Sequence, residues 1–205
     1  LALMFIGVAV SLSACSPNPV SGRKQLLLVP EQQIVQAAQE SYFTQLNQAK
    51  QQGKLDAHPA TVARVKRIAQ RVIAQTVAYR PDSRQWAWEI HVVDDASVNA
   101  YCMAGGKIAV FTGLLQQVKP SDDELAQVIA HEVAHALSSH SREKISLQLG
   151  ADLALQLLAN ARNSSPQEQQ MLSTATTLAV KLPNSRTMEN EADRIGMQYM
   201  YSAGY

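Results

Sequence analysis

The chain has 205 residues, of which 46% are hydrophobic and 17% are charged. This length suits one domain with a full hydrophobic core, and the composition excludes a chain that is disordered over most of its length. The formal net charge of +1 argues against a nucleic-acid-binding protein that relies on bulk positive charge.

The N-terminus has the pattern of a lipoprotein signal peptide. Residues 1–12 form an apolar run that is too short to span a bilayer comfortably, and a Leu-Ser-Ala-Cys sequence at residues 12–15 ends it. This ending resembles the bacterial lipobox, in which the signal peptidase cuts before the cysteine and the cysteine is lipidated. We therefore expect a signal peptide over residues 1–14, then a lipidated Cys15 and a tether over residues 15–29.

Two alternatives stay open for this segment: a chance cysteine after a conventional signal peptide, or a short membrane anchor. Ser16, directly after the cysteine, favours the outer membrane by resemblance to lipoprotein sorting in Gram-negative cells. We expect the protein to face the periplasm of a bacterial cell envelope, anchored by lipid in the outer membrane. Because neither an initiator Met nor a basic segment precedes Leu1, we also expect residues to be missing before it.

The segments after the tether predict an α+β fold that is mostly helical, with a small β-sheet. Apolar residues alternate over 86–93, which predicts a strand, and two short strands are expected around Gly105-Gly106. Ser121 and Glu124 predict a capping box at the start of the central helix. The basic residues within 59–78 indicate a solvated helix face, because no aromatic residues are interleaved with them. The predicted helices cover residues 31–52, 59–78, 122–140, 145–158, 167–180 and 186–202, and the predicted strands 86–93, 99–103 and 107–112.

The residues that carry chemistry are concentrated in His131-Glu132-Val133-Ala134-His135. Two histidines four residues apart project from one face of a helix and can bind one zinc ion. Glu132 lies beside them, where it can take a proton from bound water as a general base. The alternative is a pair of core histidines satisfied by hydrogen bonds. Small and apolar residues surround the motif, and zinc is the natural partner for imidazoles buried among them.

A catalytic zinc site needs a third protein ligand, and two side chains are candidates. On a continuing helix His140 is turned about 140° away from His135, and no glycine lies between them to let the chain turn. Glu189 is the better candidate, because Asp193 lies four residues later on the same predicted helix face. One carboxylate can bind zinc while the other accepts a hydrogen bond from a ligand histidine. Glu191 is expected to point elsewhere on that helix.

Two separated motifs resemble a known family of metallopeptidases. His-Glu-Val-Ala-His is followed at residues 185–193 by Ser-Arg-x-x-Glu-x-x-Ala-Asp. This combination resembles the membrane-associated gluzincins that include HtpX, the CAAX prenyl proteases and the mitochondrial Oma-type peptidases. Residues 18–26, 99–106 and 113–115 are similar to the Oma-like bacterial lipoprotein branch of that family.

The resemblance implies a zincin-like fold with an active-site helix, one zinc ion per chain and endopeptidase activity. It also implies that Glu132 is the general base and that the zinc ligands are His131, His135 and Glu189. A substrate polypeptide would pair by strand addition with an edge strand. The residues that correspond to this edge strand are Asn99, Ala100, Tyr101 and Gly105.

The chain also departs from that family. HtpX and the prenyl proteases have several membrane helices, whereas this sequence predicts none after Cys15, so a prenylated substrate is not expected. The family continues into a His-Pro segment followed by Arg, but this chain stops at Tyr205. We therefore expect the peptidase domain at 30–205 to be truncated and a transition-state stabiliser to be absent. Arg186 and Tyr101 are the visible candidates for that role.

These observations predict a zinc metalloendopeptidase that hydrolyses peptide bonds of misfolded or unassembled cell-envelope proteins. The residues predict proteolysis, whereas the quality-control role is family analogy. The alternatives are a zinc-stabilised, non-catalytic envelope chaperone or assembly lipoprotein, and a hydrolase for a non-peptide substrate. Glu132 argues against the non-catalytic protein, because binding alone requires no base. The expected partners are polypeptide substrates and, through the lipid on Cys15, a membrane, but no nucleic acid.

Overall fold

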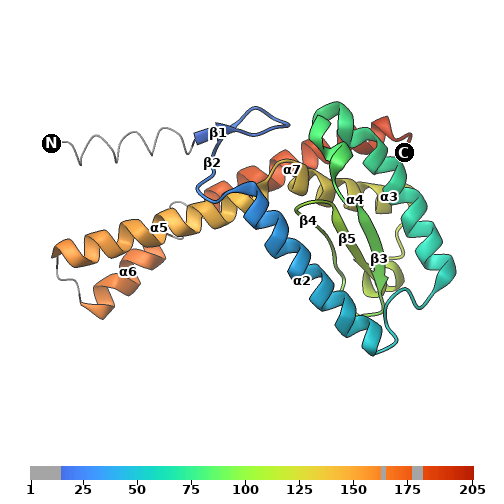
Figure 1. The fold of residues 1–205 in the computed structure, drawn as a ribbon, viewed down its shortest axis with the longest axis horizontal. Helices are drawn as coiled ribbons and strands as arrows, with labels where there is room; N and C mark the ends of the chain where they lie inside the picture. The colour runs from blue at the N-terminus through green and yellow to red at the C-terminus, as the bar shows by residue number, and fades with distance from the viewer. Residues whose placement is uncertain (1–14, 163–164, 177–181) are drawn as a thin grey trace.

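The computed structural model describes residues 15–162, 165–176 and 182–205, so the signal peptide expected at residues 1–14 lies outside the described part (Figure 1). The fold is α+β and mostly helical, with small sheets, as the sequence predicts. The α-helices are α2 (Glu31–Gln51), α3 (Pro59–Tyr79), α4 (Asp122–Leu137), α5 (His140–Arg162), α6 (Pro166–Thr176) and α7 (Leu182–Ser202). The short helices are η1 (Pro81–Gln85) and η2 (Leu114–Val118), and the strands are β1 (Cys15–Pro17), β2 (Lys24–Leu26), β3 (Glu89–Val93), β4 (Ala100–Met103) and β5 (Lys107–Phe111).

The larger sheet has three strands in the order β3-β5-β4. The central strand β5 runs parallel to β3 and antiparallel to β4, which places β4 at an edge of the sheet. Gly105 and Gly106 have φ angles of 80° and 84° in the turn from β4 to β5, a conformation that glycine adopts without a steric penalty. Gly105, expected to belong to the edge strand, therefore lies in the turn after it.

The strand expected over 86–93 is shorter in the structure. β3 begins at Glu89, and residues 86–88 form an irregular link between the 3-10 helix η1 and the strand. The indole N–H of Trp88 donates a hydrogen bond to the Ser83 carbonyl at 2.9 Å, which ties the segment before the strand to η1.

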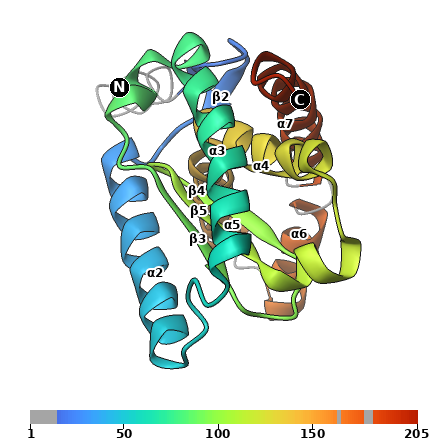
Figure 2. The ribbon, with the colours of Figure 1, turned by 90° about the vertical axis from the view of Figure 1, so that its right-hand side faces the viewer.

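Helices cover both faces of this sheet (Figure 2). Side chains alternate along the strands, so Ile108 and Val110 face α3 and α4 while Ala109 faces α2. On the α2 side, the buried Tyr42 hydroxyl donates a hydrogen bond to the Ile108 carbonyl at 2.8 Å. The sheet is thereby fixed against the helices on either side.

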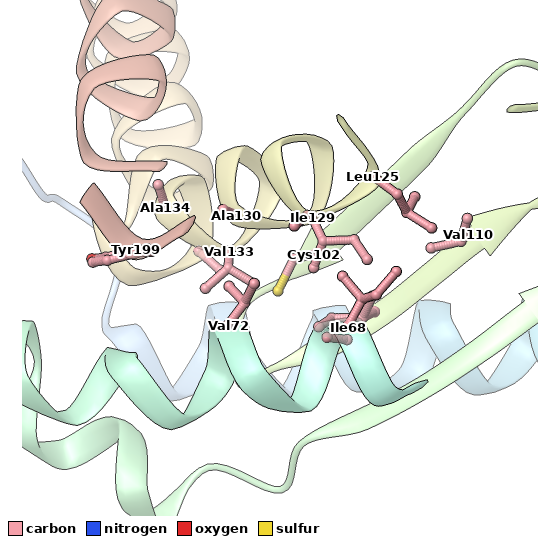
Figure 3. Packing of buried hydrophobic residues seen from close by; sticks show 14 of the residues in the cluster. Ile68, Val72, Cys102, Val110, Leu125, Ile129, Ala130, Val133, Ala134 and Tyr199 are labelled. Carbon is pink, nitrogen blue, oxygen red and sulfur yellow. The ribbon is translucent and has the colours of Figure 1, made fainter. Parts of the chain in front are cut away.

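The central helix α4 packs in the main hydrophobic core, between the sheet, α3 and α7 (Figure 3). The predicted capping box starts it: Ser121 Oγ accepts a hydrogen bond from Glu124 N at 3.2 Å, and the Glu124 carboxylate accepts one from Ser121 N at 2.7 Å. Ile129 and Val133 are at most 1% exposed, so this helix is held rigidly by packing. The two histidines of the motif lie on the remaining face of α4.

The end of α4 differs from the sequence prediction. The helix ends at Leu137, and Ser139 takes a left-handed φ of 56°, so the chain turns sharply without a glycine. Arg80 stabilises this turn, since its guanidinium donates hydrogen bonds to the Leu137 carbonyl at 2.9 Å and to Ser139 Oγ at 3.1 Å. The prediction that a continuing helix carries His140 away from His135 is therefore wrong.

The segment expected as a tether is folded against the domain. β1 and β2 form an antiparallel hairpin, in which Asn18 and Gln25 are 2% and 1% exposed. Beside this hairpin, α5 and α6 project away from the sheet (Figure 1). Within the described residues, no helix combines the length and apolar character that crossing a membrane requires.

Candidate metal centre

Two helices bring three potential metal ligands together. α4 carries His131 and His135, and α7 carries Glu189. Nε2 of His135 lies 3.0 Å from Nε2 of His131 and 3.2 Å from Oε2 of Glu189. Nε2 of His131 lies 3.4 Å from the same carboxylate oxygen. These three side chains form a group that could hold one metal ion, and it is the ligand set expected from the sequence.

The second nitrogen of each imidazole has a partner that sets its tautomer. Nδ1 of His131 lies 2.8 Å from Oδ1 of Asp193, and a carboxylate only accepts, so His131 carries its proton on Nδ1. Nδ1 of His135 lies 2.8 Å from Nδ1 of His140, whose Nε2 lies 3.1 Å from Oε2 of Glu191. His140 therefore donates from Nε2 to Glu191 and accepts at Nδ1 from His135. In its neutral form, each of the two α4 histidines therefore presents an Nε2 lone pair.

The donor geometry fits a metal ion. Two nitrogen lone pairs 3.0 Å apart would repel each other, and either a shared proton or a metal cation between them removes that repulsion. A tetrahedron with metal–nitrogen bonds of about 2.0–2.1 Å has edges of about 3.3–3.4 Å. The observed separations of 3.0, 3.2 and 3.4 Å are close to those edges. A metal ion held by these three side chains would keep a fourth position for water or substrate, as in catalytic sites.

The electrostatic environment keeps the ligands in metal-binding form. Burial, with the neighbouring His140, lowers the pKa of His135 to about 4, so its imidazole is neutral at physiological pH. Burial favours protonation of Glu189, but His135 and Lys144 outweigh it and hold the pKa of this carboxyl below its ordinary value. Glu189 is therefore an anion beside the neutral imidazole of His135.

Glu132 lines the same cleft as the three ligands but makes no contribution to the ligand group. Burial is the main cause that raises the pKa of its carboxyl above the ordinary value, although His131 opposes the shift. A raised pKa brings a carboxylate closer to the range in which it exchanges protons efficiently near neutral pH. This environment suits the role of general base.

Two residues near the centre lie where the sequence interpretation did not expect them. His140 is 1% exposed and contacts His135, although its nitrogen atoms do not join the ligand group. Glu191, expected to point elsewhere, is 7% exposed and contacts His140. The sequence carried one signal for these contacts, which is a third histidine close to the other two. A buried imidazole needs polar partners, so His140 could have been expected to contact other polar side chains.

The cleft in front of the centre is bounded by the edge strand. Asn99, Ala100 and Tyr101 line it together with the motif residues, whereas Gly105 does not. The Tyr101 hydroxyl donates a hydrogen bond to Gln45 Oε1 of α2 at 3.0 Å, so it is already engaged. Lys144 also lines this cleft, and its Nζ lies 3.6 Å from Oε1 of Glu189. Lys144 was not recognised from the sequence.

The remaining candidate residues lie outside this cleft. Arg186 is an exposed residue on α7 and is not among the residues that line the cleft. Cys15 is exposed at the start of β1, and Cys102 is buried in the core. The two cysteines are free of a disulfide.

Comparison with known proteins agrees with this geometry. The model of the family described as peptidase family M48 matches residues 59–205. The chain is 35% identical to the mitochondrial metalloendopeptidase OMA1 of Schizosaccharomyces pombe over 185 residues, which is 90% of this chain and 52% of that protein. It is 44% identical to the protein of the same name from Arabidopsis thaliana over 119 residues, which is 58% of this chain and 23% of that protein.

A bacterial protein is also similar. The chain is 31% identical to the putative beta-barrel assembly-enhancing protease of Vibrio cholerae over 121 residues, which is 56% of this chain and 25% of that protein. The chain thus spans about half the length of the Schizosaccharomyces pombe relative and less of the other two. Since the family model covers well over half of the residues, the chain belongs to peptidase family M48.

Proposed function

We propose that this chain is the catalytic domain of a zinc-dependent metalloendopeptidase. The observation that carries the proposal is the convergence of His131, His135 and Glu189, with Glu132 in the same cleft. Nitrogen and carboxylate oxygen donors in a three-ligand arrangement suit zinc. Zinc, when bound, polarises the scissile carbonyl and lowers the pKa of water. The names of the relatives, which include metalloendopeptidases, support the same activity.

The side chains of the cleft have distinct tasks in this proposal. Asp193 and His140 hold the two imidazoles at Nδ1, which leaves both Nε2 atoms to bind a metal ion. Glu132 accepts a proton from the attacking water and later passes it to the leaving amine. Since its carboxyl pKa is raised by burial, the returned proton is available at a pH nearer to neutrality.

The edge strand β4 is the proposed substrate-binding element. Within the described residues β4 pairs only with β5, so the backbone on its other edge is available to an extended peptide. Ala100 and Tyr101 of this strand line the cleft beside His131 and Glu132. A substrate strand added there would bring its peptide bond to the metal centre. This arrangement favours a polypeptide over a small non-peptide substrate.

We further propose that the protein acts on misfolded or unassembled proteins of a bacterial cell envelope. The lipobox-like sequence before Cys15 supports a lipid anchor, and the Vibrio cholerae relative is named for beta-barrel assembly. The exposed position of Cys15 at the beginning of β1 is compatible with an acyl chain. By the resemblance of Ser16 to lipoprotein sorting signals, the anchor would lie in the outer membrane.

A Glu132→Gln variant tests the proposed activity. The amide cannot accept the proton while the ligands are intact, so casein hydrolysis should fall by about 100-fold or more with zinc still bound. Glu40→Gln, an exposed substitution on α2, is the control and should behave as wild type. Casein hydrolysis should also stop when a chelator removes the metal. A wild-type protein that binds zinc but never cleaves casein would instead favour the non-catalytic chaperone.

A further inference from the structure

A loop at the tip of the N-terminal hairpin contacts residues that support the metal centre. Asn18 forms this loop: its Oδ1 accepts hydrogen bonds from the backbone N–H groups of Val20 at 2.8 Å and Ser21 at 3.1 Å. The Asn18 N–H donates to the Arg23 carbonyl at 2.6 Å, and Gly22 has a φ of 72°. The closed loop directs the Arg23 side chain towards α5 and α7.

Arg23 joins two buried carboxylates that come from different helices. Its Nη1 and Nη2 donate to the two oxygens of Glu143 on α5 at 2.8 and 2.6 Å, and its Nε donates to Oε2 of Glu191 on α7 at 3.0 Å. Glu143 is 2% exposed and Glu191 is 7% exposed. Two carboxylates so deeply buried need a cation, and Arg23 is the cation that both contact.

From Glu191 the contacts lead to a metal ligand. Oε2 of Glu191 lies 3.1 Å from Nε2 of His140, and Nδ1 of His140 lies 2.8 Å from Nδ1 of His135. Oε1 of Glu191 accepts a hydrogen bond from the Ser21 hydroxyl of the same loop. Glu191 and His140 are buried and each holds its neighbour, so Arg23 and the ring of His135 are linked by a continuous series of hydrogen bonds.

Asn18 of the loop and Gln25 of β2 also hold the turn that places His140. The Gln25 side-chain amide donates to the Ser138 carbonyl and to Glu143 Oε2, each at 2.8 Å. The Asn18 side-chain amide donates to the same Ser138 carbonyl at 3.3 Å. Two independent connections therefore lead from residues 18–25 to the position of His140.

We propose that Arg23 is a positioning residue of the metal centre, which fixes the ring of His135 through Glu191 and His140. The proposal rests on the zinc site proposed above. An imidazole that is held at its second nitrogen binds metal more tightly, and loss of such support typically costs about 10–100-fold in affinity. Arginine is required because its planar fork makes three hydrogen bonds to two carboxylates, which the ammonium group of lysine cannot reproduce.

Zinc affinity of purified variants separates positioning from simple stabilisation of the fold. Arg23→Gln should lower zinc affinity by about 10–100-fold, measured by competition with a chromophoric chelator at a temperature where the protein is folded. It should also change the visible spectrum of the cobalt-substituted protein, and Arg23→Lys should restore part of both. Arg64→Gln is the matched control, because Arg64 pairs with Asp122 at 2.7 Å far from the centre. Arg64→Gln should lower Tm without changing zinc affinity.

The outcomes distinguish this inference from the proposed function. A folded Arg23→Gln protein with wild-type zinc affinity and an unchanged cobalt spectrum overturns the positioning role and leaves the zinc site standing. A wild-type protein that binds no zinc overturns both. Should Arg23→Gln fail to fold, the charge-balanced variant Arg23→Gln/Glu143→Gln is measured instead and judged by the same affinity and spectrum.

Discussion

Nδ1 of His131 lies 2.8 Å from Oδ1 of Asp193, a residue on the same helix as the proposed ligand Glu189. One helix therefore supplies both a ligand and the support for a second ligand from α4. The Asp193 side chain is 63% exposed, so this contact adds little to the stability of the fold. Its contribution to metal binding can be measured separately from folding.

Asp193→Ala should lower zinc affinity or activity by about 10–100-fold, because the His131 ring is no longer held in its metal-binding tautomer and orientation. Tm of the metal-free protein should change little. Competition with a chelator gives the affinity, and Gln198→Ala, exposed on the same helix, serves as the control. Equal zinc affinities for the Asp193 and Gln198 variants would remove Asp193 from the site.

Glu189→Ala should lose most bound zinc and all activity, since two imidazoles alone make an incomplete site. His140→Ala should keep the metal with reduced affinity, because Nδ1 of His140 contacts Nδ1 of His135 and is not directed at the Nε2 atoms. Zinc content of the two purified variants decides between the candidates. An empty His140 variant beside a fully loaded Glu189 variant would reverse the assignment.

Local sequence patterns predicted the parts of the site that are close together along the chain. The spacing of His131 and His135 depends only on helix geometry, and the capping box of Ser121 and Glu124 spans a single turn. Glu189 lies 54 residues after His135, and it was predicted from its spacing to Asp193 on one helix face together with the motif resemblance. Alternation of apolar residues over 86–93 predicted a strand, and the structure has one over Glu89–Val93.

The contacts that depend on distant residues were beyond the sequence interpretation. Ser139 turns the chain after α4 because Arg80, 59 residues earlier, binds the turn, and no local signal marks that partnership. The loop around Arg23 lies 168 residues from Glu191 along the chain, and composition made its segment look like a tether. Polar networks between remote segments are set by tertiary packing, which neither propensity nor periodicity encodes.

Cys15→Ser should prevent lipid modification and release the protein from the membrane fraction. Within the described residues, no helix is apolar and long enough to serve as a replacement anchor that spans the bilayer. Fractionation of bacteria that express the full chain, with salt washing to remove peripheral proteins, measures the effect. Cys102→Ser is the matched control, because Cys102 is buried and should not affect anchoring. A Cys15 variant that remains in the washed membrane would contradict lipid anchoring through this residue.

The crossing of α4 and α7 offers a test of how closely the metal-binding helices must approach. A Cβ atom at Gly196 of α7 would lie 2.9 Å from the backbone nitrogen of His131 and 3.0 Å from its Cα. The neighbour is helix backbone, which cannot rotate away as a side chain could. Alanine at this position would force the two helices apart, and with them the ligands His131 and Glu189.

Gly196→Ala should therefore lower both Tm and zinc affinity. Alanine in a helix is normally favoured over glycine by about 1 kcal/mol, but overpacking of this kind costs about 1–3 kcal/mol and separates the ligand-bearing helices. Gly150→Ala on α5 is the matched control, since its Cβ would meet only the Leu26 and Leu28 side chains at 3.6 Å, an ordinary contact. That variant should keep or raise Tm and bind zinc as wild type does. Thermal melts give Tm, and chelator competition gives the zinc affinity of both proteins. If the Gly196 variant matches the Gly150 variant in Tm and in zinc affinity, the close crossing of the two helices is unnecessary.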